Sequence, residues 1–123
     1  MDHAGHNLIY LLVRYDKSRT HTFIGSTSNF ADRLREHNKS GSTWLPVLAL
    51  QMPTTRATSI KTLREQWKRS ARGLDSRVKF GFTLAKKNKA TVFIHDIDTP
   101  ILKFLNQQRE EPRVVDASFW EQF

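Results

Sequence analysis

An arginine and a histidine near the start of the chain have the spacing to act together on an anion. On a helical period, Phe30, Arg33, Leu34 and His37 fall on one side of a predicted helix, so both polar groups share its inward face or edge. Burying a guanidinium is costly unless it meets an anion, and we therefore expect Arg33 to line a cleft that takes a carboxylate or phosphate. The alternative is an arginine paired with an aspartate, or lying along the helix edge with its head in water.

The residues just before this helix favour an anion site. Residues 25–28 (Gly-Ser-Thr-Ser) precede the helix N-terminus, where backbone N–H groups and hydroxyls can meet an oxyanion. The two apolar runs before them are expected to form a hairpin that brings Tyr10 within reach of the same place. Tyr10 as an ordinary core aromatic of a strand is the competing interpretation, and His37 as a hydrogen-bonded histidine at the core edge is another.

A hairpin and a helix must position these groups. Residues 8–14 are an apolar run of strand formers, residues 16–21 (DKSRTH) supply a turn, and residues 22–24 lead to Gly25 as a second strand.

The first helix has its own start and stop signals. Ser28 or Asn29 is a suitable N-cap, and Asp32 falls at the third helical position if Asn29 is the cap. The helix is expected to run to about Asn38, before an SGS turn.

A further strand and a long helix follow. Residues 45–52 are an apolar run long enough for a strand, and Pro46 indicates that its start lies at an edge. The segment 54–72 predicts a helix capped by one of its two leading threonines, with Gly73 as the C-cap past its end.

The last third of the chain is less uniform. Residues 78–84 alternate apolar side chains, which suits a strand but leaves a short helix open. Residues 91–97 predict a strand, and residues 100–108 a final helix with Pro at its start. The expected elements thus open in the order strand, strand, helix.

Composition limits the class of protein. The 123 residues, 38% of them hydrophobic, fit a single domain over residues 1–109, with a tail over 110–123 whose end, FWEQF, suits docking on the domain or on a protein partner. The absence of cysteine excludes disulfides, thiol catalysis and Cys-based zinc fingers. With no signal peptide or membrane span, we expect an intracellular protein, cytoplasmic or nuclear, that is neither secreted nor bound to a membrane.

The net charge of +8 is concentrated in the middle of the chain. Residues 56–89 carry eleven Lys or Arg against two acidic residues, whereas residues 1–55 carry six against four and residues 90–123 three against six. A basic block on an ordered domain predicts a polyanion such as a phosphate backbone, and a solvated helix face is the alternative.

An ordered set of residues resembles the opening of a GIY-YIG nuclease domain, especially the branch of structure-specific DNA-junction nucleases. The match covers about thirty residues closely and extends more weakly to Trp67. The residues that carry it are Ile9-Tyr10, Phe23-Ile24-Gly25, Ser26, Asn29, Arg33, Leu34 and His37-Asn38.

The resemblance implies an α+β fold, a small antiparallel β-sheet of three or more strands flanked by helices, with a phosphodiesterase site on one face of the sheet. It implies an endonuclease that hydrolyses DNA phosphodiester bonds, with branched or structured DNA as a candidate substrate. Tyr10 matches the first tyrosine of the motif and would help to deprotonate a water, while Phe23 stands where the second tyrosine belongs. Arg33 matches the essential arginine, which would contact the phosphoryl oxygens, and His37 matches a frequent helix histidine. A single divalent ion, Mg²⁺ with Mn²⁺ as an alternative, would steady the leaving group.

Three positions depart from the family pattern. Leu8 replaces the first glycine, and Phe23 lacks the hydroxyl of the second tyrosine. The family's metal-binding glutamate lies three residues after a leucine on a later helix. Counting from Leu63 puts Gln66 there, whereas the nearby carboxylate is Glu65, so the position of the metal ligand stays open between them.

Helical geometry bears on that choice. Ile60, Leu63, Trp67 and Ala71 form an apolar stripe, with Glu65 roughly opposite it among basic residues and Gln66 closer to it. An amide is a poor magnesium ligand, so Gln66 would imply a degenerate site, or else a register shift that restores Glu65 as the ligand.

The alternative function is therefore a catalytically degenerate module of the same fold that binds nucleic acid without cutting it. An RNA-associated structural protein also fits the charge, but it does not explain the hairpin and its arginine. For either role in DNA binding, the expected contacts are Ser26, Thr27 and Asn29 before the first helix and Lys61, Lys68, Arg69 and Arg72 on the outer face of the second.

Overall fold

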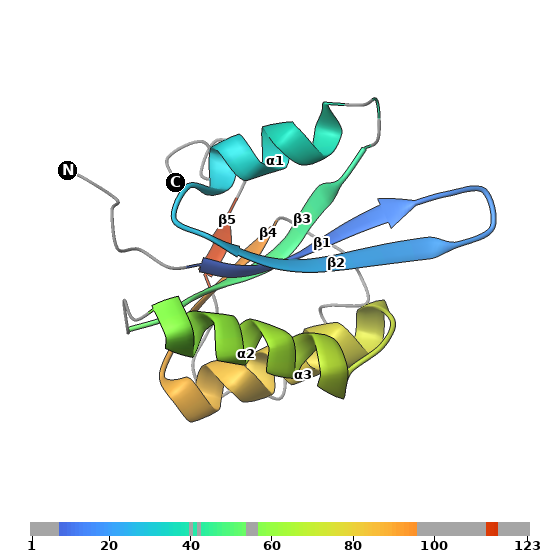
Figure 1. Ribbon diagram of the computed structural model, residues 1–123. Coiled ribbons are helices and arrows are strands. Elements are labelled where there is room, and N and C mark those ends of the chain that lie inside the picture. Colours follow the sequence, from blue (N-terminus) through green and yellow to red (C-terminus); the bar gives the residue numbers. More distant parts are fainter. Residues whose placement is uncertain (1–7, 40, 42, 54–56, 96–112, 116–123) are drawn as a thin grey trace.

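A single β-sheet with helices on both faces forms the fold (Figure 1). The computed structural model describes residues 8–39, 41, 43–53, 57–95 and 113–115. The elements are β1 (Leu8–Tyr15), β2 (Thr20–Thr27), α1 (Phe30–Asn38), β3 (Leu45–Gln51), α2 (Ala57–Ser70), α3 (Leu74–Asn88), β4 (Thr91–His95) and β5 (Arg113–Val115). The strand order is β2-β1-β3-β4-β5, with β5 parallel to β4 and the other pairs antiparallel. The predicted α+β class is confirmed.

Helix α1 covers one face of the sheet, and α2 and α3 cover the other (Figure 1). Successive side chains of β1 alternate between these two layers because a strand has a period of two. Tyr10 and Leu12 pack with Phe30 of α1, whereas Ile9 and Leu11 belong to the core that contains Trp67 of α2. Burial on both faces explains why β1 is a continuous apolar run rather than an alternating one.

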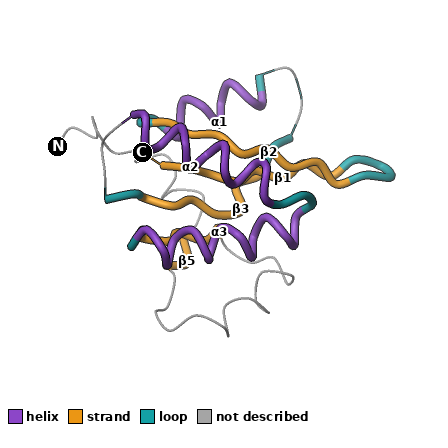
Figure 2. The backbone as a smooth tube through the Cα atoms, turned by 60° about the horizontal axis from the view of Figure 1, so that its bottom comes forward, coloured by secondary structure: helices purple, strands orange, loops and turns teal. Residues whose placement is uncertain are grey.

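The predicted hairpin and first helix are confirmed. Strands β1 and β2 pair through their whole lengths, and Figure 2 shows that the hairpin extends beyond the rest of the sheet. Asn29 is the N-cap of α1: its Oδ1 accepts a bond of 3.2 Å from the Asp32 backbone N–H. Asn29 Nδ2 donates in turn to the Asp32 carboxylate over 2.8 Å, so cap and third helical residue hold each other.

Strand β3 lies inside the sheet, but its described pairing with β4 begins beyond Pro46. Pro46 pairs with Leu12 of β1 next to a register shift, while the described pairing with β4 begins at Leu48. Within the described part of the chain Pro46 therefore has a strand on one side only, which suits a residue that lacks an N–H donor.

Residues 78–84, for which the sequence left a strand or a helix open, belong to α3. The prediction that Gly73 is the C-cap of the preceding helix is wrong. Helix α2 ends at Ser70, and Gly73, with φ of 82°, takes the N-cap position of α3. Gly81 lets α3 approach α2, because a Cβ there would lie 2.7 Å from Trp67 Cζ2. The helix predicted over 100–108, the threonines at 54 and 55 and the tail end at 116–123 lie outside the described residues.

Candidate functional site

Tyr10 and His37 meet at the edge strand β2. The Tyr10 side chain points from β1 toward α1, and its Oη lies 3.3 Å from His37 Nε2. The ring passes so close to Gly25 that a Cβ at that residue would lie 2.5 Å from Oη. Phe23 completes the group, with its ring centroid 4.5 Å from that of His37. The structure thus brings together three of the residues that the sequence nominated, and it explains why the strand carries a glycine at this point.

The surroundings shift the pKa values of Tyr10 and His37 in opposite directions. Burial raises the pKa of the Tyr10 hydroxyl, against the positive charges of Arg33 and Arg64, which lower it. Burial also lowers the pKa of His37, and Arg33 lowers it further. At neutral pH Tyr10 is therefore protonated and His37 is neutral. In the tautomer with its proton on Nδ1, His37 accepts a hydrogen bond from the Tyr10 hydroxyl.

The expected burial of Arg33 is wrong. Its side chain is 55% exposed, and Nη1 donates to Glu36 Oε2 over 3.1 Å. The nine-residue helix α1 buries Phe30 and Ala31, which turns residue 33 toward solvent and within reach of Glu36 one turn later. The alternative of an arginine at the helix edge is the correct one. Its charge still acts on the site, since it lowers the pKa values of both Tyr10 and His37.

The relative positions expected for Glu65 and Gln66 are also wrong. Glu65 is half-buried, with Oε1 3.2 Å from Arg64 Nη2 and 4.0 Å from Lys68 Nζ, whereas Gln66 is exposed. Ile60, Trp67 and Ala71 are buried, as the stripe predicts. Because α2 also packs against the edge strand β2, its inner face is wider than the apolar stripe and extends to residues 64 and 65.

The described residues do not form a ready magnesium site. Glu65 Oε1 faces two cations, which a metal ion would have to displace. No group of three His, Asp or Glu side chains that could hold a metal occurs in the described part of the chain. Hard cations such as Mg²⁺ prefer carboxylate and water oxygens without competing positive charge. The donor set therefore does not fit the ion that the sequence resemblance implies.

The hydroxyls and amide before α1 take part in local structure. Ser26 Oγ accepts a bond of 3.2 Å from Arg64 Nη1, on the sheet face that α2 covers. Thr27 Oγ1 accepts from the Asn29 backbone N–H over 2.9 Å and donates to the Asn29 carbonyl over 3.1 Å. These contacts hold the turn into the helix. They do not present the hydroxyls as a free cradle for an oxyanion.

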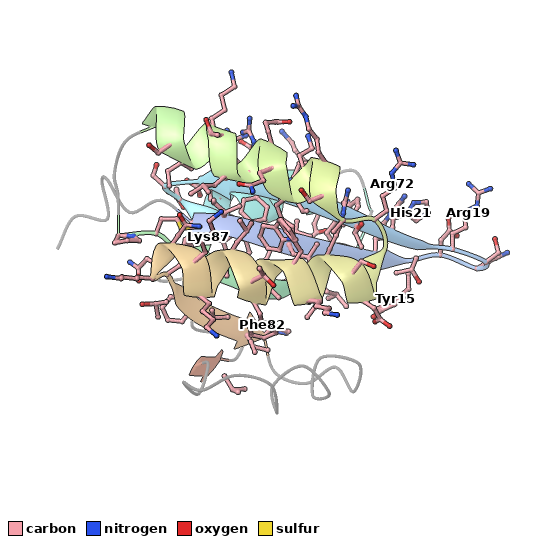
Figure 3. All side chains as sticks on the ribbon, turned by 90° about the horizontal axis from the view of Figure 1, so that it is seen from below. Tyr15, Arg19, His21, Arg72, Phe82 and Lys87 are labelled. Carbon is pink, nitrogen blue, oxygen red and sulfur yellow. The ribbon has the colours of Figure 1, made fainter. Side chains whose placement is uncertain are left out.

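The four basic residues proposed for α2 and its end lie on the surface. Lys61, Lys68, Arg69 and Arg72 are exposed. Arg72 projects into solvent at the end of the helix pair that lies nearest the hairpin (Figure 3). We call these four residues the basic face.

The sequence did not single out Trp44, which packs against Phe23 and His37. It also did not single out Arg64 or Arg14. Arg64 joins α2 to β2 through a hydrogen bond to Ser26. Its position four residues after Ile60 and three before Trp67 could have placed it on the inner face of the helix. Arg14 and Trp44 lie next to each other, with the guanidinium carbon 5.2 Å from the indole centroid. No local pattern relates them, because they lie on β1 and just before β3.

No family model matches this chain, and no curated protein matches it. None of the helices among the described residues has the length and apolar character needed to span a bilayer.

Proposed function

We propose that this protein is an endonuclease that hydrolyses DNA phosphodiester bonds at a site centred on Tyr10 and His37. The observation that carries the proposal is the 3.3 Å contact between Tyr10 Oη and His37 Nε2 over Gly25. A buried phenol is a weak base by itself, and a neutral imidazole in contact with it supplies a place for its proton.

The proposed step transfers one proton through this pair. A water loses a proton to Tyr10 Oη while the phenol proton moves to His37 Nε2. The water oxygen forms a bond to phosphorus, and the bond to the leaving nucleoside oxygen breaks. The leaving oxygen takes up a proton from solvent water, and His37 releases its proton to solvent, which restores the resting pair.

Arg33 is proposed to bind the phosphoryl oxygens. Its present partner is Glu36, in an exposed pair of a kind that contributes about 0–1 kcal/mol. A phosphate can therefore replace Glu36 at small cost, and the guanidinium offers it two donors. No step of this mechanism depends on a metal ion. Metal dependence, with Mg²⁺ or Mn²⁺ and with Glu65 as ligand, remains a separate proposal because it requires Arg64 and Lys68 to release the carboxylate.

The basic face lies on the side of the sheet opposite to α1, and it is proposed to bind the phosphate backbone where the DNA passes the edge strand β2 and continues along α2. Four exposed cations on one helix and its end supply attraction that does not depend on base sequence.

A second candidate function is nucleic-acid binding without cleavage. Two observations favour it: Phe23 has no hydroxyl to contribute, and Glu65 is held by Arg64 and Lys68. Under this proposal Arg33 and the basic face bind the backbone, and no bond is broken.

Cleavage of labelled linear, flapped and four-way DNA separates the two functions. We expect cutting by the parent protein and its loss in Tyr10→Phe, His37→Gln and Arg33→Ala. Arg35→Ala is the matched control, because Arg35 is an exposed arginine of the same helix that pairs with Asp32. Binding with no cutting in Mg²⁺, Mn²⁺ or EDTA would overturn the enzyme proposal in favour of the binding module.

The same assay tests the metal ligand. If Glu65 binds the ion, Glu65→Ala should lose activity in Mg²⁺ while Gln66→Ala, an exposed neighbour, keeps it. Equal activity of both variants and the parent would exclude Glu65 as a required ligand.

A further inference from the structure

A half-exposed group of side chains, which includes His37, lies beside Tyr10 on the sheet face that α1 covers. It consists of Phe23, His37, Trp44 and Arg14, which we call the stacking cluster. The ring centroids of Phe23 and His37 are 4.5 Å apart, and each lies 6.2 Å from the Trp44 ring. All three pairs are inclined by about 60°, so no ring of the cluster is stacked flat on another.

The stacking cluster is the outer end of a row of rings that begins in the core. Phe30 and Tyr10 are buried, and the Tyr10 ring lies 6.2 Å from that of Phe23. Phe23 is 36% exposed, and His37 and Trp44 are half-buried. The buried rings support the outer ones from below. An aromatic surface thus reaches solvent where the proposed reaction takes place.

Trp44 is held at this surface by its backbone as well as by the packing of its half-buried ring against the core around Tyr10. Asn38 Oδ1 accepts a bond of 2.6 Å from the Trp44 N–H, and Asn38 Nδ2 donates to the Trp44 carbonyl over 3.3 Å. Both bonds tie the segment before β3 to the end of α1. An anchored ring loses little conformational freedom when a ligand binds, which favours recognition.

Arg14 adds a positive charge to the rings. Its guanidinium carbon lies 5.2 Å from the centre of the Trp44 ring. Among the described residues Arg14 Nε is buried without a hydrogen-bond partner. Aromatic faces beside a cation are the combination that binds a strand with exposed bases, since the rings stack on bases and the cation meets the phosphate.

We propose that the stacking cluster binds an unpaired base of single-stranded DNA, with Arg14 at the adjoining phosphate. The inference rests on the proposed function, because it specifies the form of DNA that the same site takes. Paired bases inside a duplex present no free face to such a surface, so an unpaired segment at a flap or junction is the expected ligand. Stacking on a ring tolerates any base because every base has a π-face, so the stacking cluster is expected to bind without a preference for base sequence.

Binding of matched single strands tests the proposal in the full-length chain. One strand is a labelled thymidine oligonucleotide of about 12 nucleotides, and the other has the same phosphates with abasic sugars throughout. We expect the parent protein to bind the base-bearing strand about tenfold more tightly. Trp44→Ala should abolish this preference and leave the affinity for the abasic strand unchanged, whereas Trp44→Phe should retain most of it. Tyr15→Ala is the matched control: Tyr15 is an exposed aromatic of the same hairpin outside the cluster (Figure 3).

Each outcome decides the matter. Equal affinity of the parent for both strands overturns the stacking role and leaves the rings as a cover for Tyr10. A preference that survives in Trp44→Ala, or disappears in Tyr15→Ala, places base recognition elsewhere and also overturns it. If Trp44→Ala does not fold, Phe23→Ala gives the same comparison at a side chain that is already partly exposed.

The stacking role and the proposed function can fail separately. A base preference without cleavage of any DNA supports the stacking cluster and overturns the enzyme. Cleavage without a base preference does the reverse. Absence of binding to both strands and to duplex DNA overturns both.

Discussion

The ring of Tyr10 lies against Gly25 of the neighbouring strand so closely that a Cβ on residue 25 would come within 2.5 Å of Oη and 2.6 Å of Cζ. Tyr10 and Gly25 are direct partners in the β1–β2 ladder, so the contact follows from the strand register. The ring centroid of Phe30 lies 5.0 Å from that of Tyr10, so the tyrosine ring has little room to move away from residue 25.

Gly25→Ala should therefore destabilise the fold and disturb the site together. We expect a loss of about 1–3 kcal/mol in the free energy of unfolding, measured by denaturant titration, because the added methyl overpacks the Tyr10 ring. A double-mutant cycle with Tyr10→Ala isolates the contact. The cost of the methyl should shrink once the ring is gone, and additive effects would contradict the steric explanation.

Removing the hydroxyl or the imidazole should abolish the proposed chemistry without unfolding the chain. Tyr10→Phe and His37→Gln should each lower the rate of DNA cleavage by about 100- to 10,000-fold, the usual contribution of positioned proton transfer. Their unfolding midpoints should stay close to that of the parent, since a single hydrogen bond contributes about 0.5–1.5 kcal/mol. Full activity in Tyr10→Phe would remove the phenol from the mechanism.

The lowered pKa of His37 predicts a loss of stability and activity in acid. The unfolded chain binds a proton at the ordinary histidine pKa of 6.5, whereas the folded chain resists it until lower pH. The unfolded state therefore holds more protons between these two values, and stability falls as the pH drops below about 6.5. Cleavage should fall at lower pH, as the pH drops through the lowered pKa of folded His37, because protonated His37 cannot accept the phenol proton. His37→Gln should flatten this part of the stability profile.

Tyr10 produces the opposite dependence at high pH. Burial raises its pKa, so above the ordinary tyrosine value the folded state holds a proton that the unfolded state has lost. Stability should fall as the pH rises through this range, and Tyr10→Phe should remove that share of the decline. Unfolding followed from pH 9 to pH 12 or so measures it.

Charge reversal should locate the backbone track. Lys61→Glu with Lys68→Glu should weaken DNA binding and reduce the slope of log affinity against log salt by about 2, one for each lost phosphate contact. Lys79→Glu with Lys86→Glu on α3 makes the same change in net charge at two other exposed lysines. Equal losses in the two double variants would mean that net charge matters, and not the basic face.

Arg77 is expected to stabilise the fold and not to bind DNA. Nε donates to the Ala71 carbonyl over 3.0 Å and Nη1 to Thr22 Oγ1 over 2.9 Å, so the side chain joins α2, α3 and β2. Arg77→Ala should lower the free energy of unfolding by about 1.5–3 kcal/mol. Arg72→Ala, at an exposed position next to the same turn, should change it by less than about 0.5 kcal/mol.

Local sequence signals determined the first half of the fold. The apolar run of β1, the turn residues and the Asn29 cap act between neighbours in the chain. The strand and the cap are found where they were expected, and the turn is two residues shorter because β2 begins at Thr20. The meeting of Tyr10, Phe23 and His37 also followed from order along the chain, because a tight hairpin and the helix after it leave few other arrangements.

Tertiary packing decided what periodicity left open or mispredicted. Residues 78–84 became helical because α3 packs on Trp67 through Gly81, a contact that alternating apolar residues do not reveal. Arg33 turned outward and Glu65 inward because the inner face of a helix depends on where the sheet edge lies beneath it, and not on the apolar stripe alone. Arg14 meets Trp44 because β1 pairs with β3, which begins directly after Trp44. The sequence thus named the side chains of the candidate site, and long-range packing decided which of them are buried, which are exposed and which aromatic surface lies beside them.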